Sequence, residues 1–370
     1  MLWAALQSPP VVRDDVSSDT LTLRRCVGES DATATALAAS RVSLVALTAG
    51  FAAARAADLV PSLRTQAVVY LVGMVALNLP HGGYEHLANL RRRTRAFRWR
   101  YVGGYLGAVG AFLGLFLARP VVGLAVGLVV ACLKGGGGDV HAMAAVTGDD
   151  HLRGRTGRLL AAVARGGAVM AVPLLAWPTT FRSFGRVMVA MFDPATAAAL
   201  SFPAEPVRLV VGGAYGVAVV GHLGLGLATG GSGRSWLIDA AETLGLVAYF
   251  AVVPVVVAVG LYFPLWYSAR QVAREFAVDA TPGDGADLLG LDDAGDVDVV
   301  VRSWGVLLLG AMSTGAVAAV VWLAARDPLG GAGPLFGAVA FWSVFISVVA
   351  LPHVVVGSAF DRERGIWHVP

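Results

Sequence analysis

Charged residues are scarce in this sequence. Only 14% of its 370 residues are charged, whereas 56% are hydrophobic. Soluble domains carry about 25% charged residues. Apolar stretches of about 17 residues or more, the length that membrane-crossing helices need, recur along most of the chain. The composition therefore excludes an ordinary soluble domain and predicts an integral membrane protein.

Cysteine and lysine are also nearly absent. Cys26 and Cys132 stand alone in the sequence, which excludes a disulfide framework and a cysteine-based metal site. Lys134 is the single lysine among 28 basic residues, and the arginines gather in short loops. Without a basic face interleaved with aromatic residues, nucleic acid is excluded as a partner. Residues 1–30 lack the basic-then-apolar pattern of a signal peptide.

Nine apolar segments predict an all-α fold, a polytopic membrane bundle of about 8–10 transmembrane helices. They cover residues 36–54, 65–80, 102–117, 121–133, 159–177, 207–228, 243–269, 304–324 and 335–357. The second, third and fourth are shorter than the roughly 20 residues of a full crossing. Each of these three either continues into its flanking residues or ends in a re-entrant turn.

The segments outside the apolar core predict the domain layout. We expect a polar lead-in over 1–34, a single transmembrane domain over 35–360 and a tail over 361–370. The transmembrane domain includes an acidic loop at 272–302. Seven aspartates lie between residues 279 and 298, a composition that suits a salt-loving host. We therefore expect a multi-pass protein in the cell membrane of a halophilic prokaryote.

Arginines at the ends of the spans predict their orientation. Six arginines lie within 91–100, three within 153–158, and Arg362 and Arg364 lie in the tail. Because basic residues gather in cytoplasmic loops, all three groups should face the cytoplasm. This arrangement requires the segment 243–269 to break at Pro254 and turn back. Five polar residues would then fall near the cytoplasmic ends of their helices: His81, His141, His222, Tyr267 and His353.

Four of the seven histidines lie in or at the edge of apolar segments, namely His81, His141, His222 and His353. An ionisable group at membrane depth is costly and is usually retained for function. Any one of the four could be a neutral histidine bonded to a carbonyl, but the four together indicate a shared polar site. Imidazole binds Zn, Cu, Fe and Ni, so the histidines predict a metal site without selecting the metal.

The most specific pattern is the run Leu-Pro-His-Gly-Gly-Tyr-Glu-His at residues 79–86. Pro80 ends or kinks the apolar span, and the paired glycines allow close backbone packing beside His81. Glu85 follows His81 by four residues, so on a helix it shares that face and can orient the imidazole. In the alternative interpretation, Glu85 and His86 belong to an interfacial segment and face lipid headgroups.

Four motifs together resemble the Brp/Blh family of carotene-cleaving membrane dioxygenases. The segment 79–85 resembles the family's Pro-His-Gly-Ala-x-Asp motif, and 165–167 resembles its Arg-Gly segment. The segments 242–244 and 262–271 together resemble a third motif of the family, the pair Glu-Thr and Tyr-Phe-x-x-Trp-His-Ser-x-Arg-His. Leu-Pro-His at 351–353 resembles a late Pro-His motif. The matches keep the family's order and extend over most of the chain.

This resemblance implies a membrane enzyme that cleaves β-carotene centrally with O2 to give two retinals. It also implies a non-haem Fe2+ held by four histidines, of which the first falls on His81 and the second on His141. The last two positions hold Tyr267 and Gln271, so His222 or His353 would complete the ligand set. Glu85 would support the first ligand. The channel for the polyene would be lined by Tyr262, Phe263 and Trp266.

Tyr267 and Gln271 leave a second function open, because they replace two imidazoles. In this alternative the protein is a non-catalytic carotenoid- or retinal-binding paralogue that assists opsin biogenesis. A transporter would need an inverted repeat or paired broken helices, and the sequence shows neither. The expected partners are the lipid bilayer, β-carotene or another carotenoid, O2 and an opsin that receives retinal.

Overall fold

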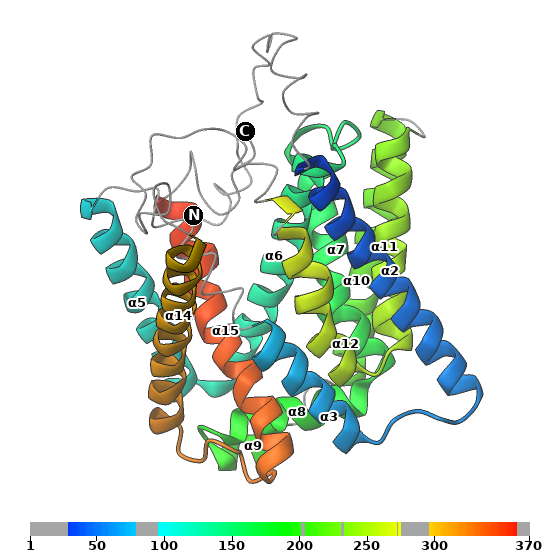
Figure 1. Cartoon of the computed structure of the whole chain (residues 1–370). Coiled ribbons are helices and arrows are strands. Elements are labelled where there is room, and N and C mark those ends of the chain that lie inside the picture. Colours follow the sequence, from blue (N-terminus) through cyan, green and yellow to red (C-terminus); the bar gives the residue numbers. More distant parts are fainter. Residues whose placement is uncertain are drawn as a thin grey trace.

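The computed structural model describes residues 29–78, 95–200, 204–230, 233–271, 273–274 and 296–360. Every regular element within these ranges is a helix, as predicted (Figure 1). The helices are α2 (Glu29–Ala56), α3 (Leu63–Leu71), η2 (Val72–Leu77), α5 (Arg95–Ala118), α6 (Pro120–Val146), α7 (Gly154–Ala176), α8 (Pro178–Ala190), α9 (Pro194–Ala199), α10 (Glu205–Gly230), α11 (Arg234–Val252), α12 (Val255–Tyr262), η3 (Phe263–Ser268), α14 (Asp296–Ala324) and α15 (Pro334–Phe360).

The distribution of side chains is that of a membrane protein. Seven of the described helices are long and apolar enough to cross a bilayer, and Leu63–Leu77 and Gly310–Ala324 are shorter apolar helices. Large apolar side chains face outward, and Leu323 is 82% exposed, whereas the side chains of Arg165 and Arg270 are fully buried. Water would penalise such an apolar exterior, and lipid does not. The predicted polytopic helical bundle is therefore confirmed.

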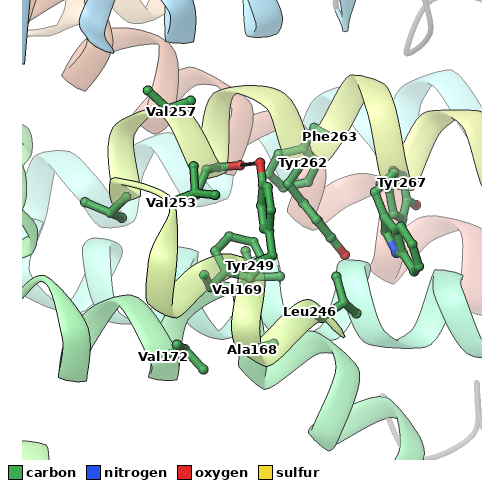
Figure 2. Close-up of a cluster of buried hydrophobic side chains, with 14 of the residues drawn as sticks. Ala168, Val169, Val172, Leu246, Tyr249, Val253, Val257, Tyr262, Phe263 and Tyr267 are labelled. Carbon is green, nitrogen blue, oxygen red and sulfur yellow. Dashed lines mark hydrogen bonds between the residues drawn. The ribbon is translucent and has the colours of Figure 1, made fainter. Parts of the chain in front are cut away.

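The predicted break at Pro254 is present. Helix α11 ends at Val252, Val253 and Pro254 are extended, and α12 begins at Val255. Figure 1 shows α11 and α12 running in opposite directions, so that η3 finishes at the end of the bundle where α6 and α15 also finish. The Tyr249 hydroxyl donates a hydrogen bond to the Ala258 carbonyl oxygen over 3.0 Å and ties the two helices together (Figure 2).

Helix α6 extends well beyond the predicted segment 121–133, since it continues to Val146. The apolar run stops at Lys134, but the helix does not, because the charge of Asp139 is paired with arginines inside the bundle. Helices α6 and α7 also pack closely enough that a Cβ at Gly136 or Gly166 would overlap the backbone of the other helix. Charge pairing and small residues thus carry α6 through the polar region.

Two short helices at the end of the bundle opposite the finish of α6 were not predicted. Helices α8 and α9 connect α7 to α10 there (Figure 1). Asp193 caps α9, because its carboxylate accepts hydrogen bonds from the Thr196 hydroxyl and from the Ala195 and Thr196 amides. These hydrogen bonds, led by that of the Thr196 side chain, lower the pKa of Asp193.

Two helices begin earlier than the predicted boundaries. Helix α2 begins at Glu29, inside the expected lead-in 1–34, and α14 begins at Asp296, inside the expected acidic loop 272–302. The rest of the lead-in, most of the acidic loop and the tail lie outside the described residues.

Candidate functional site

Arg165, in the middle of α7, binds three carboxylates at once. Its Nε donates to Asp139, its Nη1 to Asp239 and its Nη2 to Glu242, each over 2.6 Å. Asp139 belongs to α6, whereas Asp239 and Glu242 are three residues apart on one face of α11. The planar guanidinium has enough N–H groups to serve all three. One side chain therefore joins α6, α7 and α11.

Two further arginines complete this group. Arg270, which follows η3, places its Nε 2.5 Å from Asp139 Oδ1, donates from Nη1 to Glu242 over 2.9 Å and lies 4.7 Å from the Trp266 ring centroid. Arg41 of α2 donates to Glu242 over 2.8 Å. The formal charges of the three arginines and the three carboxylates, +3 and −3, therefore cancel. We call these six residues the ionic cluster: Arg41, Asp139, Arg165, Asp239, Glu242 and Arg270.

Two histidines contact the carboxylate oxygen of Asp239 that Arg165 does not bind. His151, from the loop between α6 and α7, places Nε2 2.7 Å from Asp239 Oδ2, and His222 of α10 places Nε2 3.1 Å from the same oxygen. Both histidines are buried, and His222 Nδ1 has no hydrogen-bond partner among the described residues. The structure therefore places His222, a predicted metal ligand, against a carboxylate of the ionic cluster.

Tyr267 and Gln271 pack against α6 at Gly138, three residues before His141. Gln271 Nε2 donates to the Gly138 carbonyl oxygen over 2.9 Å, and a Cβ on Gly138 would lie 2.8 Å from the Tyr267 ring. His141 Nδ1 lies 2.7 Å from the Gly137 carbonyl oxygen. A carbonyl only accepts, so Nδ1 carries the proton and the lone pair of the neutral ring is on Nε2. Metal-binding histidines are commonly held in this way.

Only part of the predicted metal site lies within the described residues. The described residues contain no group of three His, Cys, Asp or Glu side chains that could hold a metal ion. His81 and Glu85 lie outside the described residues, as does the side chain of His353. The set of His81, His141, His222 and His353 remains a prediction. Of its members, His141 is bonded through Nδ1 to a backbone carbonyl of its own helix, and His222 contacts Asp239.

An elongated apolar cavity approaches these residues. It has an empty volume of about 1360 Å³ including its open mouth, and lies between α6, α8, α12 and α15. Along α6 its wall runs from Leu124 to Lys134, which is about 15 Å at 1.5 Å per residue. Tyr267 lines it as well. The cavity therefore reaches from α8 to Lys134 of α6 and Tyr267 of η3.

The three predicted channel aromatics occupy different places. Phe263 lines the cavity, whereas Tyr262 and Trp266 are buried in the neighbouring core. Figure 2 shows Tyr262, Phe263 and Tyr267 along α12 and η3, with Tyr262 pointing toward Leu246 of α11. One face of this segment therefore borders the cavity, and the other packs into the bundle.

The sequence analysis considered only histidines at membrane depth and missed four members of the polar region: Arg41, Asp139, His151 and Asp239. Asp139 and Asp239 lie within long apolar helices, so the rule that singled out His141 also applied to them. His151 lies in a polar loop and carries no such signal. Its burial depends on α10 and α11, since the hydroxyl of Thr229 donates to its carbonyl oxygen over 2.9 Å.

Comparisons with known proteins show the family to which the chain belongs. The family model described as Beta-carotene 15,15'-dioxygenase matches residues 72–361. Proteins named probable beta-carotene 15,15'-dioxygenase Brp, from two strains of Halobacterium salinarum, are 55% identical over 338 residues, covering 90% of this chain and 94% of theirs. A probable beta-carotene 15,15'-dioxygenase Blh from Halobacterium salinarum is 33% identical over 299 residues, covering 79% and 83%. No solved structure matches. The chain belongs to the β-carotene 15,15'-dioxygenase family.

Proposed function

We propose that this protein is a carotenoid dioxygenase of the cell membrane that cleaves β-carotene with O2 into two retinals. The observation that carries the proposal is the elongated apolar cavity, whose wall includes Tyr267 and α6 as far as Lys134. A hydrocarbon polyene dissolves in the bilayer and can be held by apolar side chains. The central double bond is replaced by two carbonyl groups, and one O2 supplies both oxygen atoms.

The proposal includes a non-haem Fe2+, which would supply the activation of O2 when bound. His81 and His141 would hold it, with His222 or His353 completing the set. The supporting observation is the hydrogen bond at His141 Nδ1, which leaves Nε2 as the metal-binding nitrogen. The ionic cluster has a positioning role, because it holds α6, α7, α11 and the residues after η3 in fixed relation.

The second candidate is a non-catalytic carotenoid- or retinal-binding protein that assists opsin biogenesis. It rests on Tyr267 and Gln271, which stand where the family resemblance implies imidazoles. Family membership over most of the chain favours the enzyme. The relatives come from a halophilic archaeon, which agrees with the expectation of a salt-loving host.

Expression in cells that accumulate β-carotene tests the proposal. The wild-type protein should produce extractable retinal, and the purified protein should contain iron. His141→Ala should lose both, because it removes a ligand from a set already short of two imidazoles. His368→Ala, in the C-terminal tail, is the matched control and should keep both. A wild-type protein that binds carotenoid without forming retinal would support the second candidate instead.

The same assay examines the remaining ligands. If the enzyme is active, His222→Ala and His353→Ala separate the two ways of completing the set, since the variant that removes the completing ligand should lose iron. Should both variants keep full activity and iron, the proposed ligand set would be wrong. If wild type is inactive, Tyr267→His combined with Gln271→His should raise the iron content, because it restores two imidazoles spaced four residues apart.

A further inference from the structure

Lys134 is an unusual member of the cavity wall. It is the single lysine of the chain, and it lines the cavity next to apolar or small residues of α6 such as Ala131 and Gly127. Its Nζ lies 5.5 Å from the centroid of the Tyr267 ring. A hydrocarbon has no group that binds an ammonium ion, so a carotene substrate gives no reason for a basic side chain on this wall.

Lysine differs from arginine at this position in its reactivity toward carbonyl compounds. The other 27 basic residues (28 less Lys134) are arginines, and an arginine would supply the same charge. A guanidinium stays protonated and does not condense with carbonyl compounds. A lysine amine does condense with them, and removal from water makes it more reactive. Lys134 therefore offers a carbonyl-reactive amine at a position where charge alone would not require lysine.

The position of Lys134 matches the place where a carbonyl would form. Lys134, Gly138 and His141 are spaced by four and three residues, so they lie on one face of α6. Lys134 and His141 are about 10 Å apart along the helix axis at 1.5 Å per residue. If the double bond is cut at this polar end, the aldehyde carbon arises there, while the rest of the retinal extends along the apolar wall towards α8.

We propose that Lys134 binds the retinal product covalently as a protonated imine. The proposal rests on the proposed function for the source of the aldehyde, and it assigns a product site that retinal itself can occupy. The ammonium form of Lys134 and the aldehyde give an iminium and one water. A carbon–nitrogen double bond replaces the carbonyl bond, two ammonium protons leave with the oxygen, and the third proton stays on the iminium. No oxidant or reductant is needed.

Covalent binding would change how the product leaves. A retinal held at Lys134 does not diffuse into the lipid until water or another amine attacks the iminium carbon. An acceptor with its own lysine can then take the retinal by exchange of one amine for the other. The protein would thus deliver retinal by transfer and not by release alone.

The test uses the purified full-length protein and added all-trans-retinal, without β-carotene, so that it does not depend on cleavage. Borohydride reduces an imine to a stable amine, and peptide mass spectrometry locates the retinyl group. We expect it on the peptide that contains Lys134, in most of the molecules. Lys134→Arg keeps the charge and should lose the adduct. A separate map of the N-terminal peptide accounts for the chain's other primary amine.

A surface lysine provides the matched control. Arg155→Lys places an amine on the exposed start of α7 in the same chain. Its adduct should be at least ten times less abundant than that of Lys134, and an excess of β-carotene should suppress labelling of Lys134 alone. Equal labelling of the two sites, or no adduct at Lys134 in folded wild type, would overturn the proposal. Labelling of Lys134 in a protein that makes no retinal would overturn only the proposed cleavage.

Discussion

Arg165 is the residue on which the ionic cluster depends most, because its three nitrogens bind three carboxylates on two helices. Arg165→Gln would leave these carboxylates buried around a neutral amide. Breaking a buried ion pair by removing one partner costs about 3–5 kcal/mol. We therefore expect a large loss of thermal stability in detergent. Arg165→Lys should recover only part of it, since a point charge cannot serve three carboxylates at once.

Arg186→Gln is the matched control, since Arg186 is exposed on α8 and donates to the Leu200 carbonyl oxygen. It removes the same charge outside the cluster, and the expected change in the free energy of unfolding is within about 1 kcal/mol. If the two glutamine variants had equal thermal stability, the cluster would not be a determinant of the fold.

At the residue scale, the sequence predicted correctly that polar side chains gather inside the bundle. It predicted less well which of these side chains contact one another. His141 was expected at a polar site and lies on α6 three residues after Gly138, which contacts Tyr267 and Gln271. His222 was expected beside the other histidines and contacts Asp239. Periodicity assigns a side chain to a helix face, but it does not determine which neighbouring helix that face meets. That choice arises from packing between segments far apart in the chain.

At the element scale, all nine apolar segments correspond to helices, and the turn at Pro254 was found because proline cannot continue a helix without losing a hydrogen bond. The end of α6 was placed too early, since hydropathy treats a paired charge like an unpaired one. Helices α8 and α9 were missed because they are short and do not resemble a membrane span. Their positions depend on the ends of α7 and α10.

At the scale of the whole molecule, the turn at Pro254 brings the polar ends of several helices together. Helices α6, α10 and α15 finish at one end of the bundle, where α7, α11 and α14 begin (Figure 1). The arginines of 91–100 and 153–158 flank helices that begin at this end. The positive-inside rule then predicts that this end faces the cytoplasm.

Single cysteines in a cysteine-free background test this orientation. Asp150→Cys and Ser358→Cys should be protected from an impermeant reagent added outside intact cells, whereas Ala195→Cys on α9 should react. Lysed cells, in which all three should react, control for accessibility. Reaction of Asp150→Cys and Ser358→Cys from opposite sides would contradict the arrangement in Figure 1.

The equal numbers of arginines and carboxylates in the ionic cluster have an electrical consequence. Moving one elementary charge across the full bilayer against a membrane voltage of 100 mV changes its free energy by about 2.3 kcal/mol. A charge located part of the way across experiences a fraction of this energy. The three arginines and three carboxylates of the cluster carry no net charge, so voltage should exert no net force on it. Glu242→Gln would leave one positive charge in excess beside three arginines.

Proteoliposomes under a potassium diffusion potential provide the measurement. The unfolding temperature of wild type should not depend on voltage, whereas that of Glu242→Gln should shift and reverse its shift with the sign of the potential. Asp150→Asn makes the same change of charge in the exposed loop between α6 and α7, outside most of the field, and should behave like wild type. By this reasoning, charge balance makes the ionic cluster insensitive to the electrical state of the membrane in which it lies.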